Sequence, residues 1–240
     1  MPTDQSLPAG ETQPDEAASS AEPSSAEELR DWLLAEWERA LPHQRSMGEM
    51  LLDRYAEPHR RYHDTRHLAA VLRRVEELAG DHDLFLVRLA AWFHDAVYAV
   101  PALQVTNEEA SARLAFRELS RAGLEQEDLN QVARLVRVTA THLPGTRDPE
   151  GELLCDADLA VLASPPEEYE AYTRAIREEY ASVPEVDYLA GRLEIMSELA
   201  ASPIFRTGKA HHLVGRARAN VEEECRVLEE QLERLQWASS

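Results

Sequence analysis

Apolar residues recur three and four positions apart through most of the chain, and prolines and glycines interrupt the pattern at intervals. This spacing places apolar side chains on one face of a helix, whereas the alternating β-branched runs typical of strands are absent from the sequence. The pattern predicts an all-α fold. The expected helices cover residues 27–41, 46–55, 65–78, 84–97, 108–122, 125–141, 167–181, 186–201 and 213–235.

The last predicted helix has an apolar seam flanked by charged residues. Steps of four and three separate the members of the seam, which are Val221, Cys225, Leu228, Leu232 and Leu235. Such a seam is typical of a short coiled coil, which would join two copies in a homodimer, and also of a helix packed on its own domain. Because the seam spans so few heptads, packing within the chain is favoured, and the homodimer is kept as the alternative.

Composition divides the chain into a tail and one domain. Residues 1–26 are rich in Pro, Ser, Ala, Glu and Gln and almost free of large apolar side chains, which predicts a disordered acidic tail. The tail lacks the basic start and apolar run of a signal peptide, so we do not expect export. Residues 27–240 are long enough for a single helical domain with its own core and a long C-terminal helix.

Net charge limits the kinds of partner that the protein can bind, and cysteine content indicates its compartment. The formal net charge of −20 repels nucleic acid phosphates and anionic bilayers, and Arg88 interrupts the longest apolar stretch. We therefore expect a cytoplasmic protein that binds neither a nucleic acid polymer nor a membrane. Cys155 and Cys225 fit no disulfide framework or metal-binding motif, which indicates a reducing compartment, and we expect both thiols to be buried.

A histidine and an aspartate, His94 and Asp95, lie side by side in the apolar stretch 89–98. Burying an imidazole and a carboxylate without partners is costly, so the pair indicates either a hydrogen-bonded core pair or a local cation, for which a metal is the simplest candidate. Other His-Asp pairs begin at residues 63 and 82. The pair at 82 follows a glycine and an aspartate, so we interpret it as a structural turn and helix cap.

Two further segments supply the same kinds of side chain. His63 and His67 are four residues apart and share one face if the segment is helical, although a solvated helix face explains that spacing equally well. Asp156 and Asp158 interrupt the apolar run 153–162. A helix cap at Asp156 explains one aspartate but not both, and we expect the two carboxylates to face nearly the same pocket.

The order His, His-Asp, Asp, each in an apolar and helix-like setting, resembles the HD superfamily of metal-dependent phosphohydrolases. The resemblance extends from about residue 60 to residue 220 and implies an all-α, HD-domain helical bundle. More narrowly, the chain is similar to a bacterial group of predicted HD phosphohydrolases. Its motifs here are Tyr-His-x-x-x-His at 62–67, Trp-Phe-His-Asp-x-Val-Tyr at 92–98, Asn-Glu-Glu-x-Ser-Ala at 107–112, Asp-Ala-Asp-Leu at 156–159, Ile-Arg-x-Glu-Tyr at 176–180, Gly-Arg at 191–192, Ile-Phe at 204–205 and Ala-Arg-x-Asn at 217–220.

The resemblance implies a set of metal ligands, residue by residue. They are His67, His94, Asp95 and Asp158. Asp156 competes for the last place, but the ligand aspartate of HD enzymes usually follows a small residue, which favours Asp158. The mixed N/O set suits one or two divalent transition metal ions, namely Mn, Fe, Co, Ni or Zn, with Mg as a further option.

The resemblance also implies catalytic residues. The segment 62–67 is similar to the signature of cyclic-nucleotide phosphodiesterases, in which the first histidine protonates the leaving group; that role falls to His63, although Asp64 stands where the signature has Asn. The catalytic set is then His63, Asp95 and Glu108. In related HD enzymes an acid placed like Glu108 serves a second metal or orients water, while a first-turn acid otherwise only complements a helix dipole.

These residues together predict a metal-dependent phosphohydrolase that cleaves a phosphoester in a small phosphorylated substrate such as a nucleotide. A bound cation suits this reaction because it activates water and offsets charge on phosphoryl oxygens. One alternative is an iron-dependent oxygenase on the HD scaffold, with His63 or His142 as extra ligands. Another is a non-catalytic module that binds metal or nucleotide. The candidates for binding the substrate phosphate are Arg192, Lys209 and Arg218.

Overall fold

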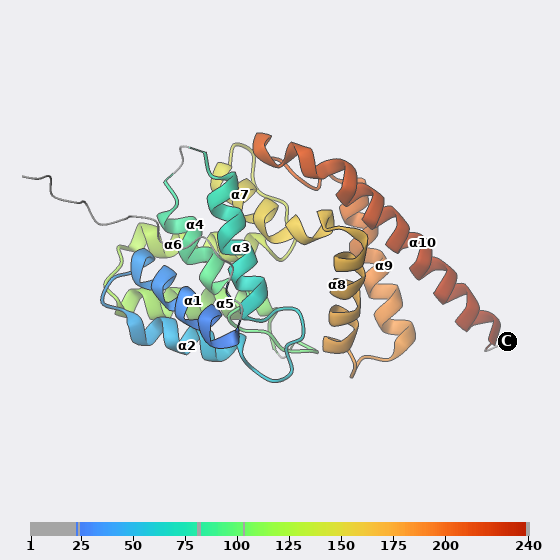
Figure 1. The fold of residues 1–240 in the computed structure, drawn as a ribbon, viewed down its shortest axis with the longest axis horizontal. Coiled ribbons are helices and arrows are strands. Elements are labelled where there is room, and N and C mark those ends of the chain that lie inside the picture. Colours follow the sequence, from blue (N-terminus) through green and yellow to red (C-terminus); the bar gives the residue numbers. More distant parts are fainter. Residues whose placement is uncertain (1–22, 24, 81–82, 103, 239–240) are drawn as a thin grey trace, which may run out of the picture.

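The computed structural model describes residues 23, 25–80, 83–102 and 104–238, and these residues are all-helical, without a strand (Figure 1). The predicted all-α class is therefore confirmed. The described part contains α1 (Ala26–Ala40), α2 (Arg45–Tyr55), α3 (Thr65–Leu78), α4 (Phe85–Phe93), α5 (Asn107–Arg121), α6 (Gln126–Val138), α7 (Pro149–Asp158), α8 (Pro166–Glu179), α9 (Glu185–Ala201) and α10 (Val214–Ala238), with 3-10 helices η1 (Leu159–Ala163) and η2 (Gly208–Leu213).

Two helices differ from the sequence prediction. The helix α7 was not expected, because its ten residues show little amphipathic pattern; its start is instead fixed locally by Asp148, which accepts a hydrogen bond from the backbone N–H of Gly151, and by Pro149 in the first turn. The helix α4 ends at Phe93 rather than at residue 97, and His94 is its C-cap. The His-Asp pair therefore lies just past a helix end and not within the helix.

Helix α4 lies at the centre of the helical core. Its residues from 89 to 93 have no exposed surface, and α1, α3, α5, α6 and α7 all pack against it. Trp37 of α1 meets Trp92 of α4 edge to face, with ring centroids 5.2 Å apart. Gly48 lets α2 pack closely on Trp37 of α1, because a Cβ atom at this position would overlap the Trp37 indole ring. A buried helix of this kind holds its C-terminal end, and hence His94, in a fixed place.

The helices α8, α9 and α10 form a layer beside this core, and α10 runs along α9 (Figure 1). A shielded ion pair between Arg192 of α9 and Glu224 of α10 joins them, and Tyr172 of α8 accepts a further hydrogen bond from Arg192. The apolar seam of α10 packs within the chain, with Val221 and Leu228 buried. Because the seam is covered by the chain's own core, it does not by itself argue for a homodimer.

Other sequence expectations fall on particular residues. Cys155 is buried as expected, but Cys225 is only half-buried, because it lies at the margin of the seam. No helix in the described ranges has the length and apolarity needed to span a bilayer. Most of the predicted tail, residues 1–22 and 24, lies outside the described residues, as does His82. The predicted end of the tail at residue 26 is slightly late, because Ser25 caps α1 and Ala26 begins it. Asp83 of the predicted cap accepts a hydrogen bond from the backbone N–H of Phe85 at the start of α4.

Candidate metal centre

Two imidazoles from different helices face each other in the core. His67 lies in the first turn of α3, where Asp64 caps the helix by accepting hydrogen bonds from the backbone N–H groups of Arg66 and His67. His94 lies at the end of α4. The two Nε2 atoms are 3.1 Å apart, and both residues are at least 95 % buried, at 5 % and 1 % exposure.

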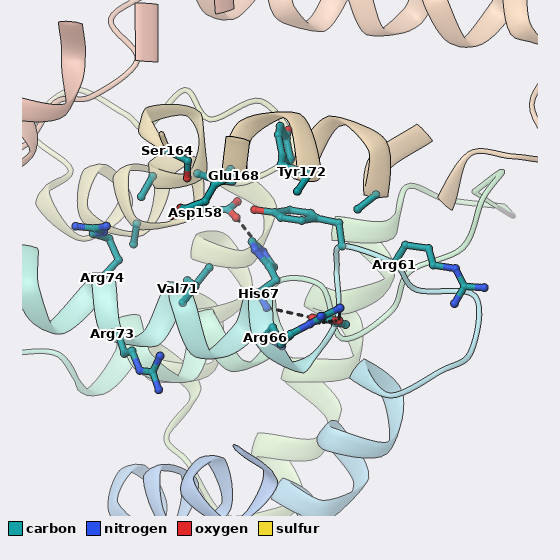
Figure 2. Close-up of a pocket in the computed structure, with 18 of the residues that line it drawn as sticks. Arg61, Arg66, His67, Val71, Arg73, Arg74, Asp158, Ser164, Glu168 and Tyr172 are labelled. Carbon is teal, nitrogen blue, oxygen red and sulfur yellow. Dashed lines mark hydrogen bonds and ion pairs between the residues drawn. The ribbon is translucent and has the colours of Figure 1, made fainter. Parts of the chain in front are cut away.

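Two carboxylates complete the cluster. The Oδ2 atom of Asp95 lies 3.1 Å from Nε2 of His94 and 3.4 Å from Nε2 of His67. The Oδ1 atom of Asp158, the last residue of α7, lies 3.2 Å from Nε2 of His67 and 3.6 Å from that of His94. The structure thus brings together all the residues that the sequence predicted as metal ligands, from three separate helix ends. Figure 2 shows two of them, His67 and Asp158, where they face the pocket.

Asp156 does not share this pocket, contrary to expectation. Its carboxylate is fully buried on another side of α7 and accepts hydrogen bonds from the backbone N–H groups of Arg206 and Thr207 at 2.7–3.0 Å. The reason is the helix itself, because residues two apart in an α-helix point in nearly opposite directions. Asp156 therefore anchors the loop before η2, and Asp158 alone faces the histidines.

The spacing of the ligand atoms fits a shared cation. One atom from each of His67, His94 and Asp95 lies within 4.8 Å of the other two, and Asp158 extends the group. Nitrogen and oxygen atoms about 2.0–2.2 Å from one divalent ion lie roughly 2.8–3.6 Å from each other at octahedral or tetrahedral angles. The observed separations of 3.1–3.6 Å fall in that range.

Electrostatics in the cluster also favour a cation. Burial lowers the pKa of His67, but hydrogen bonds to Asp158 and Asp95 outweigh it, so its pKa is raised. For His94 the nearby charge of Asp95 likewise overcomes burial and holds the pKa well above the usual range. Burial raises the pKa of both aspartates, yet the charge of His94 holds their pKa values well below the usual range. The site therefore stabilises positive charge between its carboxylates.

A hydrogen bond to the preceding turn of α4 fixes the tautomer of His94. Its Nδ1–H donates a hydrogen bond of 2.7 Å to the backbone oxygen of Ala91 in the preceding turn. In the neutral ring the lone pair is therefore on Nε2, which points into the cluster. This is the usual arrangement of a metal-binding histidine, whose second nitrogen donates to a carbonyl or carboxylate.

A buried arginine holds the backbone around the cluster. The side chain of Arg60 has no exposed surface, and its Nη1 atom donates to the backbone oxygens of both His63 and Asp95, at 2.9 and 2.8 Å. The guanidinium also lies over the rings of Tyr55 and Tyr98, 5.1 and 5.6 Å from their centroids. Arg60 therefore joins the segment before α3 to the segment after α4.

His63 lies beside the cluster and is oriented by Glu179. Its ring centroid is 5.5 Å from that of His67, although His63 precedes α3, so the two residues are not on one helix face as expected. The Nδ1–H of His63 donates to Oε2 of Glu179 at 2.7 Å, while Tyr98 stacks on the ring at 4.1 Å. The Nε2 atom is thereby left as the exchangeable position of the ring.

His142 adds a contact to the cluster. Its Nε2–H donates to Oδ2 of Asp158 at 2.9 Å, and the backbone of His142 has a φ of 52°, in the left-handed region that non-glycine residues rarely adopt. Such a conformation persists where the surrounding structure requires it, and it is common at functional sites. Asp158 thus contacts three histidines through its two oxygens.

The other candidate residues do not line the pocket that opens beside the cluster. Glu108 is half-buried in the first turn of α5 and does not line the pocket beside the histidines. Arg192 is held by Glu224 and Tyr172, Lys209 donates to the backbone oxygen of Glu77, and Arg218 is exposed on α10. None of the three basic residues lines the pocket.

A pocket of about 580 Å³ opens beside the cluster, between α3 on one wall and the end of α7, η1 and α8 on the other (Figure 2). His67 and Asp158 line it, so the cluster is accessible from this side. Four arginines, at residues 61, 66, 73 and 74, line the pocket together with four acidic residues, at 64, 77, 158 and 168. Arg66 pairs with Asp64 and Arg74 with Glu77, so the pocket walls carry both signs of charge, and the guanidinium groups offer local hydrogen-bond donors to an anion.

Arg60 and Glu179 were missed by sequence reasoning. Arg60 lies before the first turn of α3, in a segment without apolar periodicity, where an arginine gives no signal of burial. Glu179 belongs to the motif at 176–180, but nothing in that motif assigned it a contact with His63.

Comparison of this chain with protein-family models, with curated proteins and with solved structures finds no match.

Proposed function

We propose that the protein is an HD-type helical phosphohydrolase of the cytoplasm, which uses a divalent cation to cleave a phosphoester in a small phosphorylated compound such as a nucleotide. The observation that carries the proposal is the convergence of His67, His94, Asp95 and Asp158 from three helix ends on one buried point beside an open pocket. A transition metal is the cation favoured by this mixed N/O donor set.

These four side chains would hold the cation, and each is supported by its surroundings. Ala91 orients His94, Asp64 fixes the turn that carries His67, and His142 holds one oxygen of Asp158. When bound, such a cation activates water and offsets negative charge on phosphoryl oxygens.

His63 would supply the leaving-group proton. In hydrolysis the oxygen of water forms a bond to phosphorus, the bond from phosphorus to the leaving oxygen breaks, and that oxygen needs a proton. Glu179 holds Nδ1 of His63, so Nε2–H is the remaining donor of a ring that lies 5.5 Å from the ring of His67. Asp64, which replaces the Asn of the phosphodiesterase signature, acts as the cap of α3, and Asn would cap a helix equally well.

The experiment combines metal analysis with a substrate panel. Purified protein is assayed for bound transition metals and for turnover of nucleotides and nitrophenyl phosphoesters, next to His94→Ala and Asp95→Ala. We expect metal in the natural chain, little in either variant, and loss of turnover in both. His212→Ala is the matched control, since His212 is an exposed histidine of η2 and should change neither quantity.

The outcomes separate the proposal from its rivals. Full turnover by His94→Ala and Asp95→Ala contradicts a hydrolase centred on this cluster. Bound metal without turnover of any phosphoester favours the non-catalytic binding module. Thermal unfolding with and without a chelator reports on the site independently of activity, because a ligand that binds only the folded state raises its stability.

An iron-dependent oxygenase is the second candidate, and His142 is the observation that favours it. A fifth residue with a ligating side chain contacts the cluster through Asp158 at 2.9 Å. Metal assignment under anaerobic conditions, followed by an oxygen-consumption assay of the iron-loaded protein, distinguishes the candidates. Iron dependence with oxygen uptake supports the oxygenase, whereas phosphoester turnover without oxygen uptake supports the hydrolase.

A further inference from the structure

The pocket beside the candidate metal centre continues well beyond it along α3. From His67 the same helix face passes Ala70 and Val71 and reaches Arg74 after seven residues, all of which line the pocket. Seven residues of α-helix rise about 10 Å. Arg74 and Arg61 lie at opposite ends of the pocket, with His67 and Asp158 between them (Figure 2).

Small apolar side chains line both walls of the pocket. Ala70 and Val71 lie on the α3 wall, and Ala157, Ala160 and Val161 lie on the wall formed by α7 and η1. Such side chains offer no hydrogen bond, so they suit the uncharged body of a substrate. Ser164 and Glu168 also line this second wall, and the carboxylate of Glu168 repels an anion, so an anionic group of a ligand is matched only where a guanidinium faces the pocket.

Arg74 is the cation at the far end. Its Nη1 donates to Oε2 of Glu77 at 2.7 Å, and its side chain is 32 % exposed, while that of Glu77 is 59 % exposed. Arg73 instead lies over the ring of Trp32, 4.7 Å from its centroid. A guanidinium has five N–H donors in a planar fork, so Arg74 can bind an anionic oxygen while it keeps the contact with Glu77.

We propose, as an extension that rests on the proposed function, that the substrate carries a second anionic group about 10 Å from the phosphoester that is cleaved. The phosphoester lies beside His67 and Asp158, the uncharged body lies over Ala70 and Val71, and Arg74 binds the second anion. The substrate class is thus an elongated bisphosphate or a phosphorylated carboxylate, rather than a simple monophosphate.

Bisphosphates of straight-chain diols test the distance directly. The manganese-loaded protein is titrated calorimetrically with the bisphosphates of propanediol, hexanediol and decanediol and with the matching monophosphates, and the release of phosphate from each is measured. We expect the hexanediol bisphosphate to bind about tenfold or more tightly than its monophosphate, the change expected of one charge-assisted hydrogen bond. The propanediol bisphosphate is too short to reach Arg74 and should show little preference.

Three variants assign the effect to Arg74. The preference for hexanediol bisphosphate should be lost in Arg74→Ala, because the substitution should weaken binding of the bisphosphate far more than binding of the monophosphate. It should increase in Glu77→Gln, because the competing carboxylate is removed. Arg226→Ala is the matched control: Arg226 is an exposed arginine paired with Glu223 three residues away on α10, and its loss should leave the preference intact.

The outcomes distinguish this inference from the proposed function. Turnover of monophosphate and bisphosphate with equal efficiency, or an equal loss of both in Arg74→Ala, overturns the second anionic group and leaves the hydrolase standing. Binding that prefers the hexanediol bisphosphate and depends on Arg74, without phosphate release, keeps the second anionic group and overturns the hydrolase. Absence of both preference and turnover overturns both.

Discussion

Glu179 holds His63 through both of its carboxylate oxygens. The Oε2 atom accepts the hydrogen bond from Nδ1 of His63 at 2.7 Å, while Oε1 accepts from the backbone N–H groups of Arg61, Tyr62 and His63 at 2.7–2.9 Å. The Glu179 side chain is only 1 % exposed. Burial raises its pKa, but hydrogen bonding to His63 outweighs burial, so the pKa is lowered and the carboxylate stays ionised. One side chain of α8 therefore fixes both the ring and the backbone of the proposed acid.

Glu179→Gln is expected to lower kcat about 10²-fold or more, with the metal content unchanged. The glutamine oxygen can still accept the backbone hydrogen bonds, but its amide would face Nδ1 and favour the wrong tautomer of His63. Steady-state kinetics and elemental analysis check this prediction. Glu178→Gln is the control, because Glu178 is the adjacent residue and its side chain is 66 % exposed. Equal effects of the two substitutions would rule out a positioning role for Glu179.

His63→Ala is expected to keep the metal but to slow poor leaving groups most. An alkyl phosphoester should lose about 10²–10⁴-fold in rate, whereas a nitrophenyl phosphoester, whose leaving group needs no proton, should lose far less. The measurement is kcat across esters with leaving groups of increasing pKa. A uniform loss across the series would remove the proposed acid role of His63.

Arg60→Gln is expected to destabilise the fold by about 2–4 kcal/mol, because glutamine cannot bridge the backbone oxygens of His63 and Asp95 and the buried acceptors lose their partner. Urea unfolding of the natural chain and the variant measures the difference. The control is Arg226→Ala on the surface of α10, for which a change within about 0.5 kcal/mol is expected. A similarly small change in Arg60→Gln would show that the two segments hold together without the guanidinium.

Asp148 makes the stability of α7 depend on pH. Burial raises its pKa, but hydrogen bonds from Arg134 outweigh burial and lower it. A carboxyl with a lowered folded pKa contributes stability that is fully present above its unfolded value of about 3.9 and is lost as pH falls through the folded pKa.

Asp148→Asn removes the charge of this residue but retains a residue that can cap a helix. We expect the variant to be less stable than the natural chain by about 1 kcal/mol near neutral pH, and the gap to close as the pH falls through the lowered folded pKa of Asp148. Urea unfolding at several pH values measures the gap. A gap that stays constant into the acid range would exclude a contribution from the charge of Asp148.

The sequence could predict the helices and the cluster because both leave a pattern. Helical spacing of apolar residues indicated the all-α class, and polar residues set in apolar runs indicated His94, Asp95 and the pair Asp156 and Asp158. The resemblance to HD enzymes favoured Asp158 of that pair. Their partners leave no such pattern. Glu178 and Glu179 are identical neighbours in the sequence, yet one side chain is 66 % exposed and the other 1 %. The direction in which each points is set by packing of α8 against the segment before α3, which no local signal encodes.

The positions of the cluster residues on their helices have a dynamic consequence. His67 is in the first turn of α3, His94 caps the end of α4, Asp158 is the last residue of α7, and His142 follows α6. Helix ends fray more readily than helix centres. A cation shared by the ends of α3, α4 and α7 would join them into one unit, and the end of α6 would be attached through the contact of His142 with Asp158. Amide hydrogen exchange at these junctions should therefore slow together when manganese is added, while the middles of the same helices exchange at unchanged rates.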